Sequence, residues 1–204
     1  MPYTVAHYID GNLVTQTSLQ PKLIHNPASG DLIGYVPIAD QTICNQAVAS
    51  AKKAWPTWSQ TTPAKRAQIL FQFRTLLEKH QAELATLLTQ EQGKTNADAK
   101  GSIARALELI GFHCGLMTQL QGSFSADVSE HIDCYTFRQS LGVCAGVSPF
   151  NFPIMVPVWM LIPAIACGNT FILKPSEQAP SATLRLFELL HEAGLPPGLS
   201  LIHI

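Results

Sequence analysis

The spacing of apolar and polar residues changes along the chain and divides it into strand-like and helix-like segments. From residue 142 onward the two kinds alternate, in the order strand 142–147, helix 153–167, strand 170–174, helix 181–193 and a strand from 199. Strand–helix–strand units of this kind form parallel sheets with right-handed connections. We therefore predict an α/β fold whose last third is a βαβαβ half of a doubly wound, Rossmann-type sheet.

The preceding segments predict hairpins followed by helices. In residues 7–14, apolar and polar positions alternate on both sides of an Asp-Gly turn. Residues 23–38 show a similar arrangement around an Asn-Pro-Ala-Ser-Gly turn, so each segment indicates two strands. Asp40 is expected to cap a helix that runs through Ala54, and Thr62-Pro63 is expected to start the next one. Because a sheet of this class normally needs more strands than the chain supplies, we expect an unpaired, aggregation-prone edge.

Apolar residues at helical spacing give each predicted helix an inward face. These faces are Ile43, Ala47 and Ala51; Ile69, Leu70, Phe73, Leu76 and Leu77; Leu84, Leu87 and Leu88; and Ile103, Ala106, Leu107, Ile110 and Leu116 in a helix of about 97–119. Residues 122–139 are polar and β-rich, which predicts a strand pair that leaves the core and returns. We expect three parts: N-terminal strands and helices (1–121), a β excursion for oligomerisation (122–141) and a truncated nucleotide-binding core (142–204).

A run of 35 uncharged residues, 139–173, raises the possibility of a membrane span, for which roughly 20 residues suffice. Four prolines interrupt the run: Pro149, Pro153, Pro157 and Pro163. The pieces between them are too short to cross a bilayer and fit a buried strand or a buried helix. We therefore expect no membrane partner.

Composition narrows the classes of function. With 47% hydrophobic residues and a net charge of −1, the chain is predicted to be globular, and no electrostatic argument favours nucleic acid. Five cysteines and seven histidines show neither disulfide nor metal-ligand spacing. This pattern predicts reduced thiols, no metal and a cytoplasmic location. Residues 1–11 indicate a strand and a turn rather than a signal peptide.

The chain contains neither of two common nucleotide-binding motifs, the P-loop and the G-x-G-x-x-G fingerprint. Residues 91–95 read EQGKT, but Leu88 stands where a P-loop needs glycine and no strand precedes it, so Gly93 is better explained as a helix end. No G-x-G-x-x-G occurs anywhere in the chain.

Polar residues follow the two apolar strands of the last third. Asn151 comes after the first strand, where its amide could stabilise an oxyanion on an acyl carbon, although capping the next helix is the more usual role of such an asparagine. Lys174 and Glu177 follow the second strand and suit a ribose, with the carboxylate favouring NAD over NADP. A solvated pair or a helix-start device is the alternative.

The motifs S-P-F-N-F-P (148–153) and G-N-T-F-I-L-K-P-S-E-Q (168–178) together resemble the aldehyde dehydrogenase superfamily, which binds NAD without the glycine fingerprint. The resemblance covers nearly the whole chain, including N-P-A-S-G at 26–30 and E-x-G-K at 91–94. Phe150 in place of the commoner Trp, with the segments 101–108 and 135–146, is similar to the CoA-acylating methylmalonate-semialdehyde dehydrogenases.

The resemblance implies a role for each matching residue. Asn151 would be the oxyanion amide, Ser148 and Phe150 would line the nicotinamide end, and Lys174 and Glu177 would hold the adenosine ribose. Gln178 lies beside them at a position where members of the family often carry Arg. The residue at 178 therefore departs from the family pattern, and its contact with the cofactor is left open. Arg105 would bind the substrate carboxylate with its guanidinium fork; without the resemblance, an exposed helix arginine is the simpler interpretation.

The resemblance also implies that the nucleophilic cysteine and the general-base glutamate lie beyond residue 204, so these 204 residues are expected to be inactive alone. The final residue departs from the family pattern, where glycine is expected, and is interpreted as non-native. The favoured hypothesis is that the chain is the amino-terminal part of an NAD- and CoA-dependent dehydrogenase of methylmalonate or malonate semialdehyde. Such an enzyme would act in valine, pyrimidine or inositol catabolism. At full length it is expected to be a homodimer or homotetramer. The alternatives are a hydrolytic aldehyde dehydrogenase and a non-catalytic nucleotide-binding module.

Overall fold

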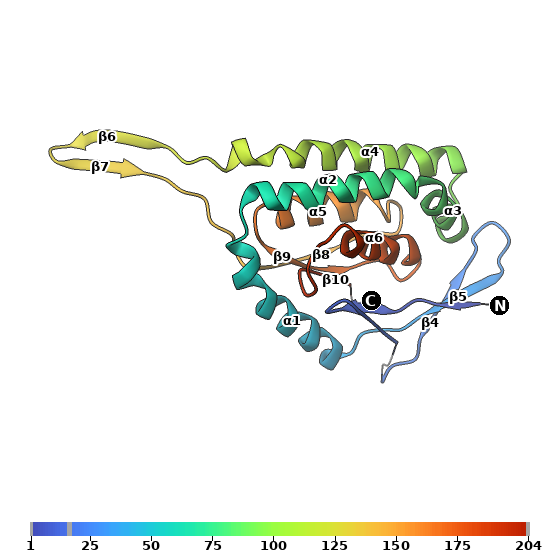
Figure 1. Cartoon of the computed structure of the whole chain (residues 1–204). Coiled ribbons are helices and arrows are strands. Elements are labelled where there is room, and N and C mark those ends of the chain that lie inside the picture. The colour runs from blue at the N-terminus through green and yellow to red at the C-terminus, as the bar shows by residue number, and fades with distance from the viewer. Residues whose placement is uncertain (1, 16–17, 203–204) are drawn as a thin grey trace.

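The computed structural model describes residues 2–15 and 18–202, with the backbone alone for residues 201 and 202. Its main sheet has five strands in the order β3-β2-β10-β9-β8 (Figure 1). They are β3 (Asn12–Val14), β2 (His7–Ile9), β10 (Ser200–Ile202), β9 (Thr170–Lys174) and β8 (Val143–Val147). The interpretation of the last residue as non-native falls on 203–204, outside the described part.

The βαβαβ prediction is confirmed. Strands β8, β9 and β10 run parallel, connected by α5 (Met155–Ala166) and α6 (Ser181–Glu192). The outer edge of β10 is covered by β2, which pairs with it antiparallel, and β3 pairs antiparallel with β2. The local sequence pattern did not predict this pairing. Within the described residues the sheet ends at β3 on one side and at β8 on the other, and the outer edge of each has no strand beside it.

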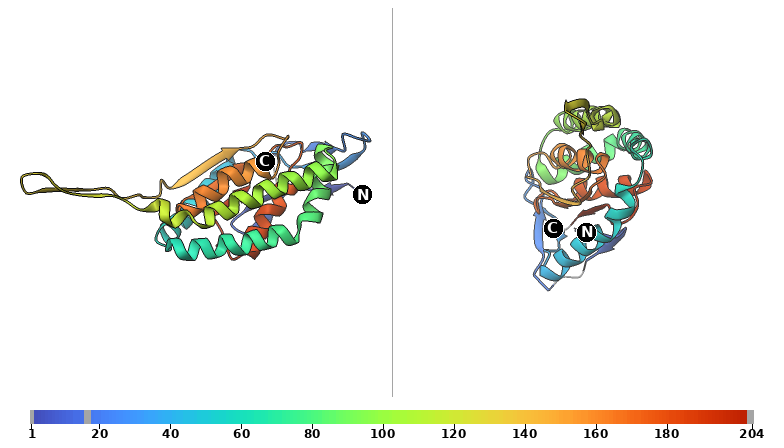
Figure 2. Two further views of the ribbon diagram at one scale, coloured as in Figure 1. Left: turned by 90° about the horizontal axis from the view of Figure 1, so that it is seen from above. Right: turned by 90° about the vertical axis from the view of Figure 1, so that its left-hand side faces the viewer.

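Helices cover both faces of the sheet (Figure 2). On one face lie α5 and α6, followed by an outer layer of α2 (Pro63–Lys79), α3 (Gln81–Gln92) and α4 (Asn96–Cys114). On the other face α1 (Gln41–Ser59) packs Ile43, Ala47 and Ala51 against Ile9 and Ile172. The inward faces expected from helical spacing are therefore correct. Leu70, Phe73 and Leu77 are fully buried, as are Ile103, Ala106 and Ile110.

The caps expected for α1 and α2 are present, because Asp40 accepts from the Ile43 N–H at 3.0 Å and Thr62 caps α2. The end of α1 was predicted wrongly: the helix continues past Ala54 and through Pro56 to Ser59. Tertiary packing holds this last turn, since Trp58 is buried and its indole N–H donates to the Ile165 carbonyl at 3.1 Å.

The helix expected over 97–119 also ends earlier. It stops at Cys114, and a 3₁₀ turn, η1 (Leu116–Leu120), follows Gly115. Glycine has little helix propensity, so a break at this position is physically reasonable. Leu116 packs only partly against the core.

The predicted strand pair projects from the body as a hairpin of β6 (Phe124–Ser129) and β7 (Ile132–Tyr135) (Figures 1 and 2). Every residue of both strands is exposed. At the opposite end of the molecule, β4 (Lys22–His25) and β5 (Leu32–Val36) form the second predicted pair, and β1 (Tyr3–Thr4) joins β5 in parallel.

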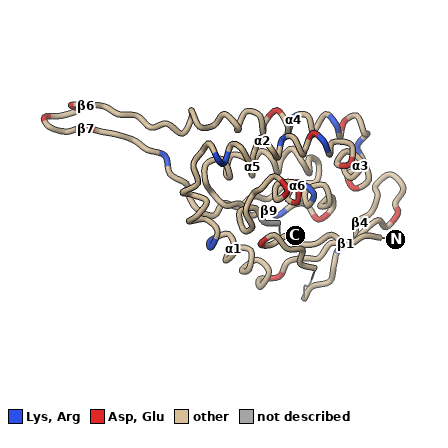
Figure 3. Tube along the Cα trace, in the orientation of Figure 1, with Lys and Arg blue, Asp and Glu red and all other residues tan. Residues whose placement is uncertain are grey.

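Along the described trace, Lys and Arg lie among Asp and Glu, mainly on the helices (Figure 3). Strand β8 and helix α5 carry no charged residue, as the uncharged run requires. Among the described residues, no helix has both the length and the apolar character needed to cross a membrane.

Candidate functional site

The two loops singled out by their sequence meet at one edge of the main sheet. Strands β8 and β9 are parallel and in register, with Val147 beside Lys174 at their carboxyl ends. The Ser148 N–H donates to the Lys174 carbonyl at 3.0 Å, which ties the two loops together where they leave the sheet. The carboxyl ends of parallel strands are where open α/β sheets bind ligands.

Beyond β9, Lys174 and Glu177 form an ion pair with an Nζ–Oε2 distance of 2.7 Å. The Lys174 ammonium and a backbone N–H, followed by Lys22, lower the pKa of the Glu177 carboxyl to about 2. Glu177 is therefore charged throughout the neutral range. Gln178 is exposed next to it and its backbone N–H donates to Ser176 Oγ at 3.2 Å.

Sequence reasoning missed Lys22 as a member of this group. From the start of β4 its Nζ lies 3.0 Å from Oε1 of Glu177, so each carboxylate oxygen has one ammonium partner. The two residues are 155 positions apart, and nothing in the local pattern around Lys22 indicates the contact.

Glu91 anchors the other end of the Lys174–Glu177 loop. It is 4% exposed and accepts from the Ser181 N–H and hydroxyl at the start of α6, and from the Tyr3 hydroxyl. Burial raises the pKa of the Glu91 carboxyl, and these hydrogen bonds oppose that rise. Burial and the adjacent Glu91 likewise raise the pKa of Tyr3. The E-x-G-K motif was the only sequence signal for this contact.

Beyond β8, Asn151 lines an open cavity of about 600 Å³ together with Arg105 of α4. Other lining residues are Gln92, Lys94, Asp98, Ser102 and Phe152. The Asn151 side chain makes no hydrogen bond within the described part of the chain. It does not cap α5, which starts at Met155 without a side-chain cap. Asn151 thus lines a space that is also lined by an exposed arginine.

Lys94 fixes the backbone beside that amide. Its Nζ donates to the Asn151 carbonyl at 3.1 Å, lies 3.4 Å from Ser102 Oγ, and stands 4.7 Å above the centre of the Phe152 ring. Burial lowers the pKa of Lys94. Gly93 ends α3 with a φ of 83°, so the rejection of a P-loop was correct, but no local pattern indicates that Lys94 reaches the loop after β8.

The remaining predicted residues, Ser148 and Phe150, lie in the loop that follows β8. Ser148 is 3% exposed, and its Oγ is buried without a hydrogen-bond partner in the described part of the chain. Phe150 is half-exposed. An orphaned hydroxyl, an aromatic ring and the charged Lys174–Glu177 pair are polar and stacking groups of the kinds that a dinucleotide requires, so these residues fit NAD.

The cysteines offer no activated nucleophile among the groups whose pKa is shifted. Burial raises the pKa of the Cys114, Cys144 and Cys167 thiols, which keeps them protonated at neutral pH. The described residues also contain no cluster of three or more His, Cys, Asp or Glu side chains able to hold a metal ion.

Comparisons with known proteins identify relatives of this chain. Residues 14–202 match the aldehyde dehydrogenase family. The chain is 46% identical over 201 residues to malonate-semialdehyde dehydrogenase of Pseudomonas aeruginosa, covering 98% of this chain and 40% of that protein. It is 42% identical over 201 residues to human mitochondrial methylmalonate-semialdehyde/malonate-semialdehyde dehydrogenase [acylating], covering 98% of this chain and 38% of that protein.

A solved structure is equally similar. It is named as a methylmalonate-semialdehyde dehydrogenase of Sinorhizobium meliloti 1021 complexed with NAD, and it superimposes with a TM-score of 0.97 at 46% identity. The alignment covers all of this chain and 41% of that one. The chain thus spans about two fifths of the length of the relatives that it matches.

Proposed function

The chain belongs to the aldehyde dehydrogenase family, and from this membership we propose that it supplies the NAD-binding part of a CoA-acylating dehydrogenase of methylmalonate or malonate semialdehyde. The observation that carries the proposal is the placement of two sets of groups beyond adjacent strand ends. The Asn151–Arg105 cavity follows β8, and the Lys174–Glu177 pair follows β9. The names of the relatives support the substrate class.

At the substrate end, the proposal uses the two functional groups of a semialdehyde. Arg105 would bind the carboxylate through its planar fork of N–H donors. Asn151 would donate from its side-chain amide to the aldehyde oxygen, which becomes negative when a nucleophile adds to the carbon. Both side chains line one cavity, and Lys94 holds the Asn151 backbone in place through its carbonyl.

At the cofactor end, Lys174 would donate to the hydroxyls of the adenosine ribose and Glu177 would accept from them. Ser148 and Phe150 would line the nicotinamide end, with Gln178 beside the ribose. NAD, when bound, supplies the hydride acceptor. Because Glu177 stays ionised at neutral pH, it would repel the 2′-phosphate of NADP, which favours NAD.

In the whole enzyme a cysteine thiolate would attack the aldehyde and a glutamate would act as general base. We assign neither role to a residue of this chain. CoA would take the acyl group after oxidation and decarboxylation, so that semialdehyde, NAD and CoA give propionyl-CoA or acetyl-CoA, CO₂ and NADH. The acylating character of the human relative supports CoA as the acceptor.

Assembly and location are parts of the same proposal. The projecting β6–β7 hairpin supports a homo-oligomer, because all of its residues are exposed and several are apolar. The five cysteines, none of them in a predicted disulfide pattern, support a cytoplasmic location.

The deciding experiment is a kinetic comparison of two aldehydes on the full-length enzyme that carries this chain. Malonate semialdehyde should give NADH and, with CoA present, acetyl-CoA; a free acid formed equally well without CoA would indicate the hydrolytic class instead.

Arg105→Gln should raise KM for the semialdehyde about tenfold or more while leaving propanal, which lacks the carboxylate, nearly unaffected. Lys100→Gln, on the same helix but outside the cavity, is the control. Equal effects on both aldehydes would contradict the role of Arg105.

A further inference from the structure

Arg66, in the first turns of α2, is a buried cation without a partner. Its side chain is 6% exposed, and within the described residues it makes neither a hydrogen bond nor an ion pair. Its Nε is completely enclosed and unsatisfied. The positive end of the α2 dipole lies nearby and makes the position still less favourable for a cation. Burial accordingly lowers the pKa of the guanidinium.

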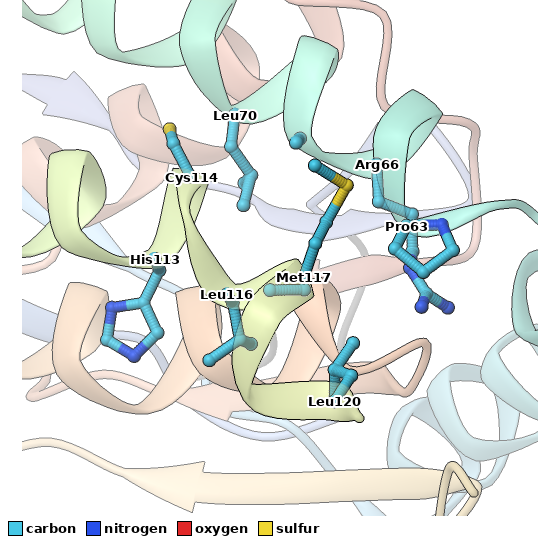
Figure 4. A pocket seen from close by; sticks show the side chains of 10 residues that line it. Pro63, Arg66, Leu70, His113, Cys114, Leu116, Met117 and Leu120 are labelled. Carbon is cyan, nitrogen blue, oxygen red and sulfur yellow. The ribbon is translucent and has the colours of Figure 1, made fainter. Parts of the chain in front are cut away.

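The surrounding chain is shaped to accept this guanidinium. A Cβ added at Gly168 would lie 2.2 Å from Nη1 of Arg66, and Gly168 also has a φ of 85°, which favours glycine. Figure 4 shows the Arg66 side chain extending past Pro63, with its guanidinium directed away from Leu70 and Cys114. The guanidinium therefore lies outside the apolar core, at the wall of a neighbouring cavity.

That place is an open cavity of about 870 Å³ at the base of the β6–β7 hairpin, which we call the Arg66 cavity. Arg138 also lines it, and so do the polar residues Ser59, Gln139, Ser140 and Asn169. None of its lining residues is an aspartate or a glutamate. Two guanidinium groups thus share a cavity whose described walls supply no negative charge.

The Arg66 cavity is separate from the proposed substrate and cofactor site. Cys167 and Asn169, which line it, precede β9 at the amino end of the strands, whereas Asn151 and Lys174 lie at the carboxyl end. Helix α5 runs between the two ends, and its 12 residues span about 18 Å.

We propose that the Arg66 cavity is an oxyanion-binding site, in which a carboxylate or phosphate group is held by Arg66 with Arg138 at its rim. An unpaired buried charge is strongly unfavourable, whereas a bidentate oxyanion satisfies the guanidinium in both charge and geometry. A free small anion or a carboxylate side chain of a second copy of this chain can supply the oxyanion, since the cavity opens where the hairpin leaves the body. The proposal does not depend on which aldehyde the enzyme oxidises.

The sign of the stability change on removing the charge tests the proposal. If an oxyanion occupies the cavity, Arg66→Met lowers Tm in phosphate buffer; if the guanidinium is unpaired, the same change leaves Tm unchanged or raises it. Inorganic phosphate is the probe, titrated into full-length protein against sodium chloride of equal ionic strength. We expect a rise in Tm with phosphate in the wild type that Arg66→Met abolishes and that requires several-fold more phosphate in Arg138→Gln.

A second measurement separates the two sources of the oxyanion. If a second copy supplies a carboxylate, the assembled protein does not respond to phosphate. Arg66→Met then weakens self-association about tenfold or more in sedimentation experiments, and the wild type responds to phosphate once diluted to the monomer. Arg66→Lys, which keeps the charge, serves if Arg66→Met does not fold. The proposal is overturned if the wild type shows no response to phosphate at any protein concentration and self-association is unchanged in the variants.

Discussion

At the scale of the residue, the candidate site depends on which side chains are engaged and which are free. Lys174, Glu177 and Glu91 are all held by ion pairs or hydrogen bonds. The Asn151 amide makes no such contact in the described part of the chain, although its backbone is fixed by Lys94. A fixed backbone with a free amide is what an oxyanion donor needs, because the donor must be in place before the charge develops.

Replacing Asn151 should therefore affect the reaction and spare the fold. In the full-length enzyme, Asn151→Ala should lower kcat by about 10²–10³-fold, the usual cost of one oxyanion donor. KM for NAD and Tm should change little, because the side chain makes no stabilising contact in the described structure. Steady-state kinetics and a thermal melt check this. A fall in Tm with unchanged kcat would show instead that Asn151 has a structural role.

Glu177 makes a pH-dependent contribution to stability. Its folded pKa of about 2 lies below that of an ordinary glutamate, so the contribution is present above the unfolded pKa and is lost as pH falls toward 2. Glu177→Gln should flatten the decline of unfolding free energy between pH 4.5 and pH 2. Lys22→Met should raise the pKa of Glu177 only in part, because Lys174 is the larger cause. Denaturant melts across this range provide the measurement, and an unchanged slope in Glu177→Gln would contradict the assignment.

At the scale of the element, one buried carboxylate joins three elements that are distant in sequence. Glu91, near the end of α3, holds Ser181 at the start of α6 and Tyr3 in β1. It thereby positions the end of the loop that carries Lys174 and Glu177. The carboxylate also lies at the positive end of the α6 dipole, which favours its charge.

Glu91→Ala should destabilise the protein by about 2 kcal/mol, because it leaves partly buried donors on Ser181 unsatisfied. It should also weaken NAD binding, since the Lys174–Glu177 loop loses its anchor. Glu83→Ala is the matched control: it makes the same substitution on the same helix, but at an exposed pair with Arg185, where little stability is expected to be lost. Denaturant unfolding and NAD titration measure both effects, and equal losses in the two variants would count against the anchoring role.

The helix and strand pattern of most elements could be predicted because local signals decide them. Asp40 and Thr62 start helices through short-range hydrogen bonds, and the Gly168-Asn169 turn separates α5 from β9. The last turn of α1 could not be predicted, because Pro56 opposes a helix locally and a distant contact of Trp58 holds it. Lys22 and Glu91 could not be predicted as site residues for the same reason, because each contacts partners that lie about 90 residues away or more in the sequence.

At the scale of the whole molecule, one buried core unites both ends of the chain. Val5, Phe73, Ile110 and Leu173 belong to a single cluster of buried side chains. The N-terminal hairpin completes the main sheet at β10, an arrangement that no local pattern encodes because strands pair across nearly 200 residues. The β6–β7 hairpin contributes nothing to this core, since each of its residues is exposed.

An exposed hairpin with apolar side chains is costly to leave in water, and this gives the last prediction. Phe124, Ile132 and Tyr135 are 66%, 53% and 70% exposed on strands that face solvent on both sides. Exposed apolar surface of this kind marks a protein–protein contact. Ile132→Asp combined with Tyr135→Asp should lower the oligomeric state of the full-length protein in sedimentation velocity while leaving its Tm at the monomer limit unchanged. Phe71→Asp, an equally exposed aromatic position on α2, is the control and should leave assembly intact. If both variants sediment like the wild type, the hairpin does not mediate self-association.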